Sequence, residues 1–266
     1  MQLTVVGCSG STSGPASPAS SYLVQAPHQG RTFSLLLDLG PGSFGALYNY
    51  LDPSEVDAIG LSHLHPDHCL DLCAYYVWAR YSHPDPLPAC PVYGPNGTAS
   101  RMVAAYDVPA ITEGPAEPTP GIGGYVPFRT WQPRQQIGPF EVRVARVDHP
   151  VEAYAVRVEE HDQDGPPGPT LVFSGDTGPC EALVELARGV DLLLVEAAFR
   201  EHPDNPPGVH LTARQAVEAG ETASAKRVVL THIPPWHDPA AVLDEAQAVA
   251  HSPVELARTG AQWTLP

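Results

Sequence analysis

Basic residues are scarce in this chain. Its 266 residues include only 14 lysines and arginines against 30 aspartates and glutamates, and the formal net charge is −16. No stretch rich in lysine or arginine makes a local exception, so the chain repels both a nucleic-acid backbone and an anionic membrane surface. We therefore expect neither nucleic acid nor a membrane among its partners. An anionic substrate would need bound cations to offset this negative field.

Long apolar runs and paired cysteines are missing as well. No apolar run approaches the roughly 18 residues that cross a bilayer, and residues 1–7 lack the basic stretch and apolar core of a signal peptide. The five cysteines are an odd number without a CxxC pair, namely Cys8, Cys69, Cys73, Cys90 and Cys180. These absences predict reduced thiols in a cytoplasmic protein. They leave open whether the chain is a monomer or a homodimer.

Short apolar, β-branched runs alternate with helix-like periodicity along the chain. The predicted strands are residues 3–6, 21–24, 33–37, 56–61, 140–147, 154–158, 171–173, 190–195 and 227–230. The predicted helices are residues 43–50, 69–81, 99–106, 180–188, 213–223 and 240–250. Proline-rich segments at residues 113–127, 165–169 and 203–207 indicate loops, because the composition does not change across them. This order predicts sheets covered by helices, in one domain that spans residues 1–266.

The most informative segment is Leu61-Ser62-His63-Leu64-His65-Pro66-Asp67-His68, which holds four candidate metal ligands within six residues. It directly follows a predicted buried strand. Residues two apart in extended backbone point the same way, so His63 and His65 can bind one metal ion together. Pro66 then turns the chain, and Asp67 and His68 begin the next helix. These two side chains face another direction and can serve a second ion a few ångströms away.

Four further candidates stand where other predicted strands end. They are His149, Asp176, Glu196 and His232. Each alone fits an ordinary polar residue at a strand end. Taken jointly they indicate a site, because ligands in layered α/β folds gather beyond the carboxyl ends of the strands.

This ordered set resembles the signature of the metallo-β-lactamase superfamily, over residues 1 to about 236. The resemblance implies an α+β fold, the metallo-β-lactamase αββα sandwich, in which two mixed sheets pack face to face between outer helices. It also implies two divalent metal ions, zinc or manganese. The implied ligands of the first ion are His63, His65 and His149. The implied ligands of the second ion are Asp67, His68 and His232, with Asp176 bridging both. The β-lactamases commonly use a cysteine where this chain has Asp176, so the resemblance points away from antibiotic hydrolysis.

Two more residues indicate which branch of this superfamily the chain resembles. Glu196 and His210 resemble the Glu–His pair of the RNase Z-type phosphodiesterases. A carboxylate beside an imidazole orients the ring and favours its protonated form, which suits a general acid; an ordinary ion pair remains the alternative. RNase Z enzymes usually insert a long tRNA-gripping arm between the positions of His149 and Asp176, and here that gap is short. The opening Gly-Cys-Ser-Gly-Ser and residues 62–72 and 183–191 are similar to the small actinobacterial cyclic-nucleotide phosphodiesterases.

The resemblance implies hydrolysis of a 3′,5′-cyclic nucleotide, such as cyclic AMP or cyclic GMP, to the 5′-monophosphate. The expected partner is thus a small anionic nucleotide. Asp67 would bind a metal ion and orient the attacking water, and His210, held by Glu196, would protonate the leaving oxygen. Three alternatives stay open: an endonuclease that processes RNA 3′ ends, a thioester or lactone hydrolase of the same fold, and a metal-binding regulator without turnover. The glycine-rich segment 7–14 fits either a phosphate-binding loop or a plain turn.

Overall fold

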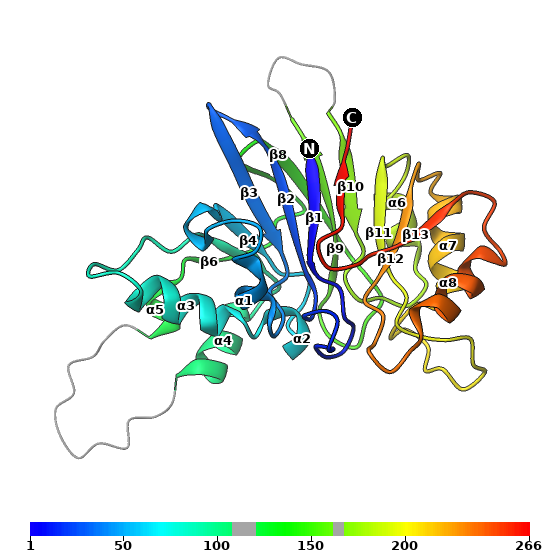
Figure 1. Ribbon diagram of the computed structural model, residues 1–266, viewed down its shortest axis with the longest axis horizontal. Coiled ribbons are helices and arrows are strands. Elements are labelled where there is room, and N and C mark those ends of the chain that lie inside the picture. Colours follow the sequence, from blue (N-terminus) through cyan, green and yellow to red (C-terminus); the bar gives the residue numbers. More distant parts are fainter. Residues whose placement is uncertain (108–120, 162–167) are drawn as a thin grey trace.

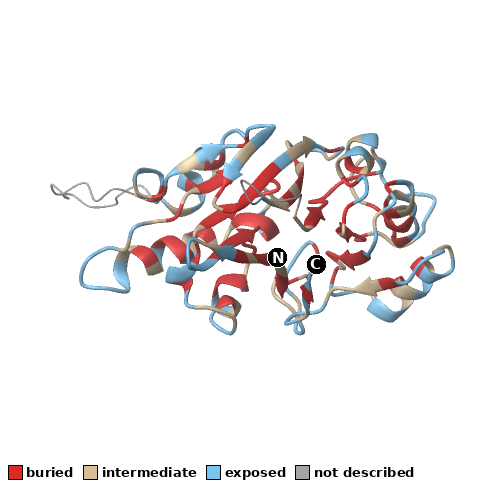
Figure 2. Ribbon diagram, turned by 90° about the horizontal axis from the view of Figure 1, so that it is seen from above, coloured by how far each residue is buried: buried red, intermediate tan, exposed pale blue. Residues whose placement is uncertain are grey.

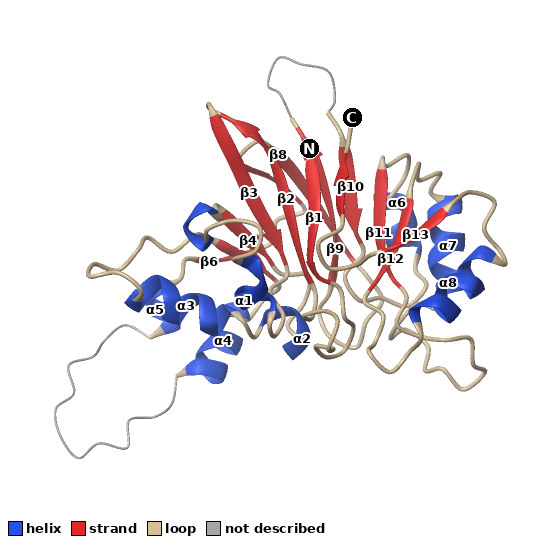
Figure 3. Cartoon of the chain, in the orientation of Figure 1, coloured by secondary structure: helices blue, strands red, loops and turns tan. Residues whose placement is uncertain are grey.

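The computed structural model describes residues 1–107, 121–161 and 168–266. Within these residues two seven-stranded sheets pack face to face, and helices lie on their outer sides (Figures 1 and 3). Each sheet combines parallel and antiparallel pairs. The predicted sandwich of two mixed sheets is confirmed.

The first sheet combines the N-terminal half of the chain with its last strand. In spatial order its strands are β14 (Gln262–Thr264), β1 (Gln2–Gly7), β2 (Ser21–His28), β3 (Arg31–Leu37), β4 (Ala58–Gly60), β5 (Val92–Gly94) and β6 (Phe128–Thr130). The pairs from β14 to β3 are antiparallel and those from β3 to β6 are parallel. The helices of this half are α1 (Ser43–Leu47), η1 (Pro53–Glu55), α2 (Pro66–Cys69), α3 (Leu72–Tyr81), α4 (Thr98–Tyr106) and α5 (Ile122–Tyr125).

The second sheet is built from the C-terminal half. In spatial order its strands are β13 (Val254–Leu256), β12 (Val228–Thr231), β11 (Leu192–Glu196), β10 (Thr170–Phe173), β9 (Tyr154–Glu160), β8 (Phe140–Arg146) and β7 (Arg134–Ile137). The pairs from β13 to β10 are parallel and those from β10 to β7 are antiparallel. Its helices are α6 (Glu181–Leu186), α7 (Ala213–Thr222) and α8 (Pro239–Gln247).

Alternation along the strands divides the core into layers. Leu171 and Phe173 of β10 point between the two sheets, whereas Val172 points to the cluster under α6, α7 and α8. The inter-sheet layer is joined across the sandwich by Tyr22 and Phe173, whose ring centroids are 4.8 Å apart. Successive side chains of a strand face opposite sides, so each strand serves two apolar layers at once. Figure 2 shows the resulting buried strands and inner helix faces between exposed outer turns.

All nine predicted strands and all six predicted helices are present, with ends that shift by a few residues. Thr212 caps α7 with its side chain and Gln215 completes the capping box. The strands β5, β6, β7, β13 and β14 were not predicted. They are three or four residues long, and most of them carry polar or charged side chains in place of the apolar run that marks the equally short β4, β10 and β12. The prediction of a loop at residues 113–127 is wrong for residues 122–125, which form the helix α5. Residues 113–120 of this segment lie outside the described part. Residues 165–167 also lie outside it, and residues 203–207 form a loop as predicted.

None of the helices in the described residues is both long enough and apolar enough to cross a membrane.

Candidate metal centre

The candidate ligands gather at one edge of the sandwich because the strands that carry them run the same way. His149 follows β8, Asp176 follows β10 and His232 follows β12, while the histidine-rich segment follows β4. The helix that carries Asp67 and His68 is α2, which lies at the lower edge of the sheets in Figure 1. The structure therefore brings all seven predicted metal ligands together, in two groups whose ligand atoms lie within 4.8 Å of one another.

The first group consists of three imidazoles. The Nδ1 atom of His65 lies 3.1 Å from Nε2 of His63 and 3.1 Å from Nε2 of His149. On its other side His149 faces the carbonyl oxygen of Val209 at 2.8 Å through Nδ1. A carbonyl only accepts, so Nδ1 donates, and the lone pair of His149 is on Nε2 toward the group. Three converging imidazole nitrogens are a donor set that suits a divalent transition-metal ion.

The second group consists of Asp67, His68, Asp176 and His232, all of them buried. The Nε2 atom of His68 lies 3.3 Å from carboxylate oxygens of both Asp67 and Asp176, and Nε2 of His232 lies 3.3 Å from Asp176. Buried polar atoms normally have hydrogen-bond partners. Here Nε2 of His68 and Oδ1 of Asp176 have none among the described residues. A cation between them would satisfy both atoms, so this group fits a metal ion.

Asp176 lies between the two groups. Its Oδ2 atom is 3.3 Å from His232 of the second group and 3.7 Å from Nε2 of His63 in the first. Burial raises the pKa of this carboxyl group, but the charges of His232, His68 and His63 outweigh it and hold the pKa well below its usual range. The side chain is thus ionised and within reach of both groups, which is the geometry that a bridging ligand needs.

Asp38 is a further residue of the centre, and the sequence interpretation missed it. This buried carboxylate faces Nδ1 of His68 at 2.7 Å and accepts hydrogen bonds from the backbone N–H and the hydroxyl of Ser62, each also at 2.7 Å. The Ser62 hydroxyl lies 3.1 Å from Nδ1 of His63. One carboxylate therefore orients a candidate ligand in each group. Its place directly after β3 is the strand-end signal that identified the other candidates, and it could have been found in the same way.

We expect Asp38→Asn to weaken metal binding by about 10- to 100-fold, the usual effect of losing a carboxylate behind a metal-binding histidine. Asp38 has a φ of 59°, and asparagine tolerates this left-handed conformation, so the variant tests the carboxylate rather than the backbone. Metal affinity is measured by competition with a chromophoric chelator. Asp57→Asn is the matched control, since Asp57 accepts from Arg31 and Ser34, outside both groups. Equal affinities in the parent and Asp38→Asn would contradict the orienting role.

The predicted pair of Glu196 and His210 is formed beside the second group. Nδ1 of His210 donates to Oε1 of Glu196 at 2.9 Å and lies 3.9 Å from Oδ2 of Asp176. Backbone N–H groups of Thr177 and Ala198 also donate to the Glu196 carboxylate, at 2.8 and 3.1 Å. The pair is therefore fixed from the protein side, and the other ring nitrogen of His210, Nε2, remains for a ligand.

The shared proton of this pair resides on His210 at neutral pH. Burial by itself lowers the pKa of His210, but the hydrogen bond and charge of Glu196 and the charge of Asp176 raise it to about 9. Burial raises the pKa of Glu196 to about 7, although the hydrogen bond and charge of His210 act in the opposite direction. The group with the higher pKa keeps the proton, so between these two pKa values the pair holds one proton and it resides on His210.

The glycine-rich segment 7–14 borders the second group. A Cβ atom at Gly10 would lie only 2.2 Å from the carbonyl oxygen of His232, so the two backbones approach as closely as glycine allows. The backbone nitrogen of Ser11 is 3.3 Å from Nε2 of His232. Nδ1 of that ring lies 2.9 Å from the Ser20 hydroxyl. The loop that follows His232 carries Trp236, whose side chain is 63 % exposed.

Comparison with known proteins agrees with this fold. The model of the "Beta-lactamase superfamily domain" family matches residues 34–233. An uncharacterized protein of Mycobacterium leprae is 40 % identical over 98 % of this chain and 87 % of its own length. The probable metallo-hydrolase YhfI of Bacillus subtilis is 26 % identical over 99 % of both chains, and its crystal structure superposes with a TM-score of 0.80 over 99 % of each. The short form of human tRNase Z, 20 % identical, superposes over both whole chains with a TM-score of 0.71.

The chain therefore belongs to the β-lactamase superfamily. More narrowly, it is a metallo-hydrolase of this fold, and the resemblance that the sequence motifs predicted is confirmed at this level. Its histidine and aspartate groups fit the divalent metal ions that such a fold implies.

Proposed function

We propose that this metallo-hydrolase uses two divalent metal ions, zinc or manganese, to hydrolyse a phosphodiester, and that its substrate is a 3′,5′-cyclic nucleotide such as cyclic AMP. The observation that carries the proposal is the Glu196–His210 pair beside Asp176. A thioester or lactone hydrolase needs the metal ions but has no need of an attached acid. An alkoxide leaving group requires a proton, and His210 is protonated and faces the site.

Each of the two ligand groups would hold one metal ion. When bound, the ions lower the pKa of a coordinated water and offset the charge of the phosphate. The first ion would be held by three imidazoles, and the second by His68, His232 and Asp67. Asp176 would bridge both. These seven side chains include only two carboxylates, so two divalent ions would leave the centre positive within a protein of net charge −16. This local charge would attract an anionic substrate.

Asp67 has the second task of orienting the attacking water. Burial raises its pKa, but the charges of the nearby His68 and His232 outweigh burial and hold the pKa well below its usual range. The carboxylate is therefore ionised throughout the neutral range and acts only as an acceptor. One oxygen can face the second ion while the other accepts a hydrogen bond from the water, which directs the nucleophile toward phosphorus.

His210 acts at the other end of the scissile bond. Its Nδ1–H is engaged by Glu196, so Nε2–H can donate to the leaving ribose oxygen as the bond to phosphorus breaks. Glu196 stabilises the imidazolium and fixes the ring plane. A general acid placed in this way contributes about 10²- to 10⁴-fold to the rate.

Processing of RNA 3′ ends is the alternative with the same chemistry. Two features of the chain, the short connection at the position of the RNase Z arm and its negative charge, do not favour binding to RNA. An arm at the RNase Z position would have to form between β9 and β10, which are separated only by residues 161–169. The charge balance of the chain also opposes binding to a polyanion. These two features favour a small substrate.

We expect one preparation of the protein to hydrolyse cyclic AMP and bis-p-nitrophenyl phosphate and to leave a tRNA precursor uncleaved. The measurement is the kcat/KM on each substrate with Zn²⁺ or Mn²⁺ supplied, and heat-inactivated protein is the control. Cleavage of the precursor with no turnover of cyclic AMP would replace the proposal with RNA processing. Turnover of thioesters alone would instead make the protein a thioester hydrolase of the same fold.

A further inference from the structure

A separate cavity of about 350 Å³ adjoins His210. Its walls come from the loop of residues 199–210, from Asp148 and from the start of α7. None of the seven predicted metal ligands is among the residues that line it. His210 is therefore common to both places: it lines this cavity, and its Nδ1 atom lies 3.9 Å from the Asp176 carboxylate of the metal centre.

The cavity offers both an apolar and a polar side. The ring of Phe199 meets His210 edge to face, with centroids 4.9 Å apart and an angle of 82° between the planes. On the polar side, the backbone of Asp148 is fixed because its carbonyl oxygen accepts a hydrogen bond from the N–H of Gly178 at 2.7 Å. Gly208, with a φ of 69°, passes so close that a Cβ atom there would be 3.1 Å from the Asp148 carboxylate. The loop and Asp148 are thus in close contact within the wall of the cavity.

The charge on the walls is mainly negative. Asp148 has no cation within 4 Å among the described residues, and Glu201 has only Arg214, whose Nε is 3.9 Å away in an exposed pair. Exposed pairs at this distance neutralise each other weakly. His202 accepts from the backbone N–H of Asp204 at 3.2 Å and lies beside that carboxylate. His210 also lines the cavity, but its Nδ1 atom is paired with Glu196 at 2.9 Å, so it adds no unbalanced positive charge.

We infer that this cavity binds the uncharged nucleoside half of the substrate, the half that carries the leaving oxygen. The inference rests on the proposed function. A general acid must touch the oxygen that it protonates, so the leaving group lies against His210. Ligand cavities span about 300–1,000 Å³, and one of 350 Å³ suits a single nucleoside better than a chain. Sugar hydroxyls and exocyclic amino groups donate to carboxylates, and the base can pack on Phe199.

The same walls determine specificity. Asp148 and Glu201 repel a leaving group that bears a further phosphate, which every internal diester of RNA does. The chain thus distinguishes a mononucleotide diester from RNA at the leaving group as well as by its overall charge. Asp148 and Glu201 determine specificity in this assignment, and neither belongs to the candidate metal-binding groups.

The dinucleotide ApA and its 5′-phosphorylated form pApA are a matched pair of substrates for this inference. Water attacks phosphorus, the bond to the 3′ oxygen breaks, and that oxygen takes the proton of His210. ApA then releases adenosine, and pApA releases adenosine 5′-monophosphate from the same position; both leave a 5′-monophosphate on the other half. The two substrates therefore differ only in the phosphate that would enter the cavity.

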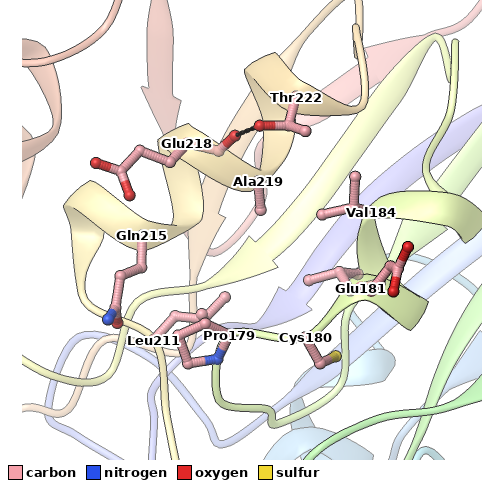
Figure 4. A pocket seen from close by; sticks show the side chains of 10 residues that line it. Pro179, Cys180, Glu181, Val184, Leu211, Gln215, Glu218, Ala219 and Thr222 are labelled. Carbon is pink, nitrogen blue, oxygen red and sulfur yellow. Dashed lines mark hydrogen bonds between the residues drawn. The ribbon is translucent and has the colours of Figure 1, made fainter.

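We expect the parent to prefer ApA in kcat/KM, and Asp148→Asn combined with Glu201→Gln to reduce that preference about tenfold, chiefly by improving pApA. The matched control is Glu218→Gln. Glu218 lies on α7 and lines the neighbouring pocket between α6 and α7 (Figure 4). It is not among the residues that line the cavity beside His210. An unchanged preference in the double variant, with turnover retained, would overturn the inference.

Adenosine binding tests the cavity without any turnover. Adenosine has no phosphate, so saturation-transfer NMR on the metal-loaded protein reports on the nucleoside site alone. We expect Phe199→Ala to weaken adenosine binding about fivefold or more, as expected for the loss of one base–aromatic contact, and Glu218→Gln to leave it unchanged. If cyclic AMP and both dinucleotides were inert while adenosine still bound through Phe199, the proposed function would fail and the cavity assignment would stand. Adenosine binding that Phe199→Ala does not change would overturn the assignment.

Discussion

Asp176→Ala is expected to reduce the hydrolysis of cyclic AMP by about 10³-fold or more, with the fold retained. Among the carboxylates of the described residues, only that of Asp176 lies within 4 Å of histidine nitrogens in both groups, so its loss would remove the bridge between the two ions. It also removes the nearest carboxylate of His232, whose Nε2 atom keeps only Asp67 at 3.7 Å, and one of the two carboxylates beside Nε2 of His68. We therefore expect one ion to bind weakly or to be lost.

The measurement combines kcat/KM with the metal content of the same sample, and circular dichroism verifies the fold. Asp244→Ala, on the exposed side of α8, is the control for the loss of a carboxylate elsewhere. Turnover near the parent value in Asp176→Ala would show that another group bridges the ions or that one ion suffices.

His210→Ala is expected to lower the rate on cyclic AMP by about 10²-fold or more and the rate on bis-p-nitrophenyl phosphate clearly less. The variant keeps all seven predicted metal ligands, so metal content should remain near that of the parent. A ribose alkoxide leaves poorly without a proton, whereas p-nitrophenolate leaves readily. Glu196→Gln should show the same asymmetry more weakly, because it disturbs the orientation and charge of His210 without removing the ring.

The chain supplies a matched control for this experiment. His251 forms another histidine–carboxylate pair, with Nδ1 2.8 Å from Glu221, on an exposed surface and in neither ligand group. His251→Ala should leave both substrates unaffected. Equal losses on the two substrates in His210→Ala would make His210 a phosphate-binding or structural residue. No loss on either substrate would contradict the proposed resemblance to the RNase Z-type phosphodiesterases.

Much of the site could be predicted because its residues follow strands. His63, His65, Asp67 and His68 are neighbours in the chain, and backbone geometry alone separates them into two directions. The distant ligands could be placed with them because parallel strands end at a common edge. The pairing of Glu196 with His210 came from resemblance; the structure confirms that the two side chains meet.

Other features have no local signal. The orienting role of Asp38 depends on where Ser62 and His68 meet after folding, although its strand-end position was visible. The strands β13 and β14 are three residues long and are stabilised by pairing with β12 and β1, far away in the sequence. The cavity beside His210 is formed by side chains of an irregular loop, whose conformation no periodicity describes.

The central claim is that the two groups hold two metal ions and that hydrolysis requires both. The direct measurement is a titration of the metal-stripped protein with Zn²⁺ or Mn²⁺, in which bound metal is determined by elemental analysis and cyclic AMP hydrolysis is followed in the same samples. We predict that binding saturates close to two equivalents per chain and that turnover rises mainly with the second. Full turnover at one equivalent, or with no bound metal, would contradict the account.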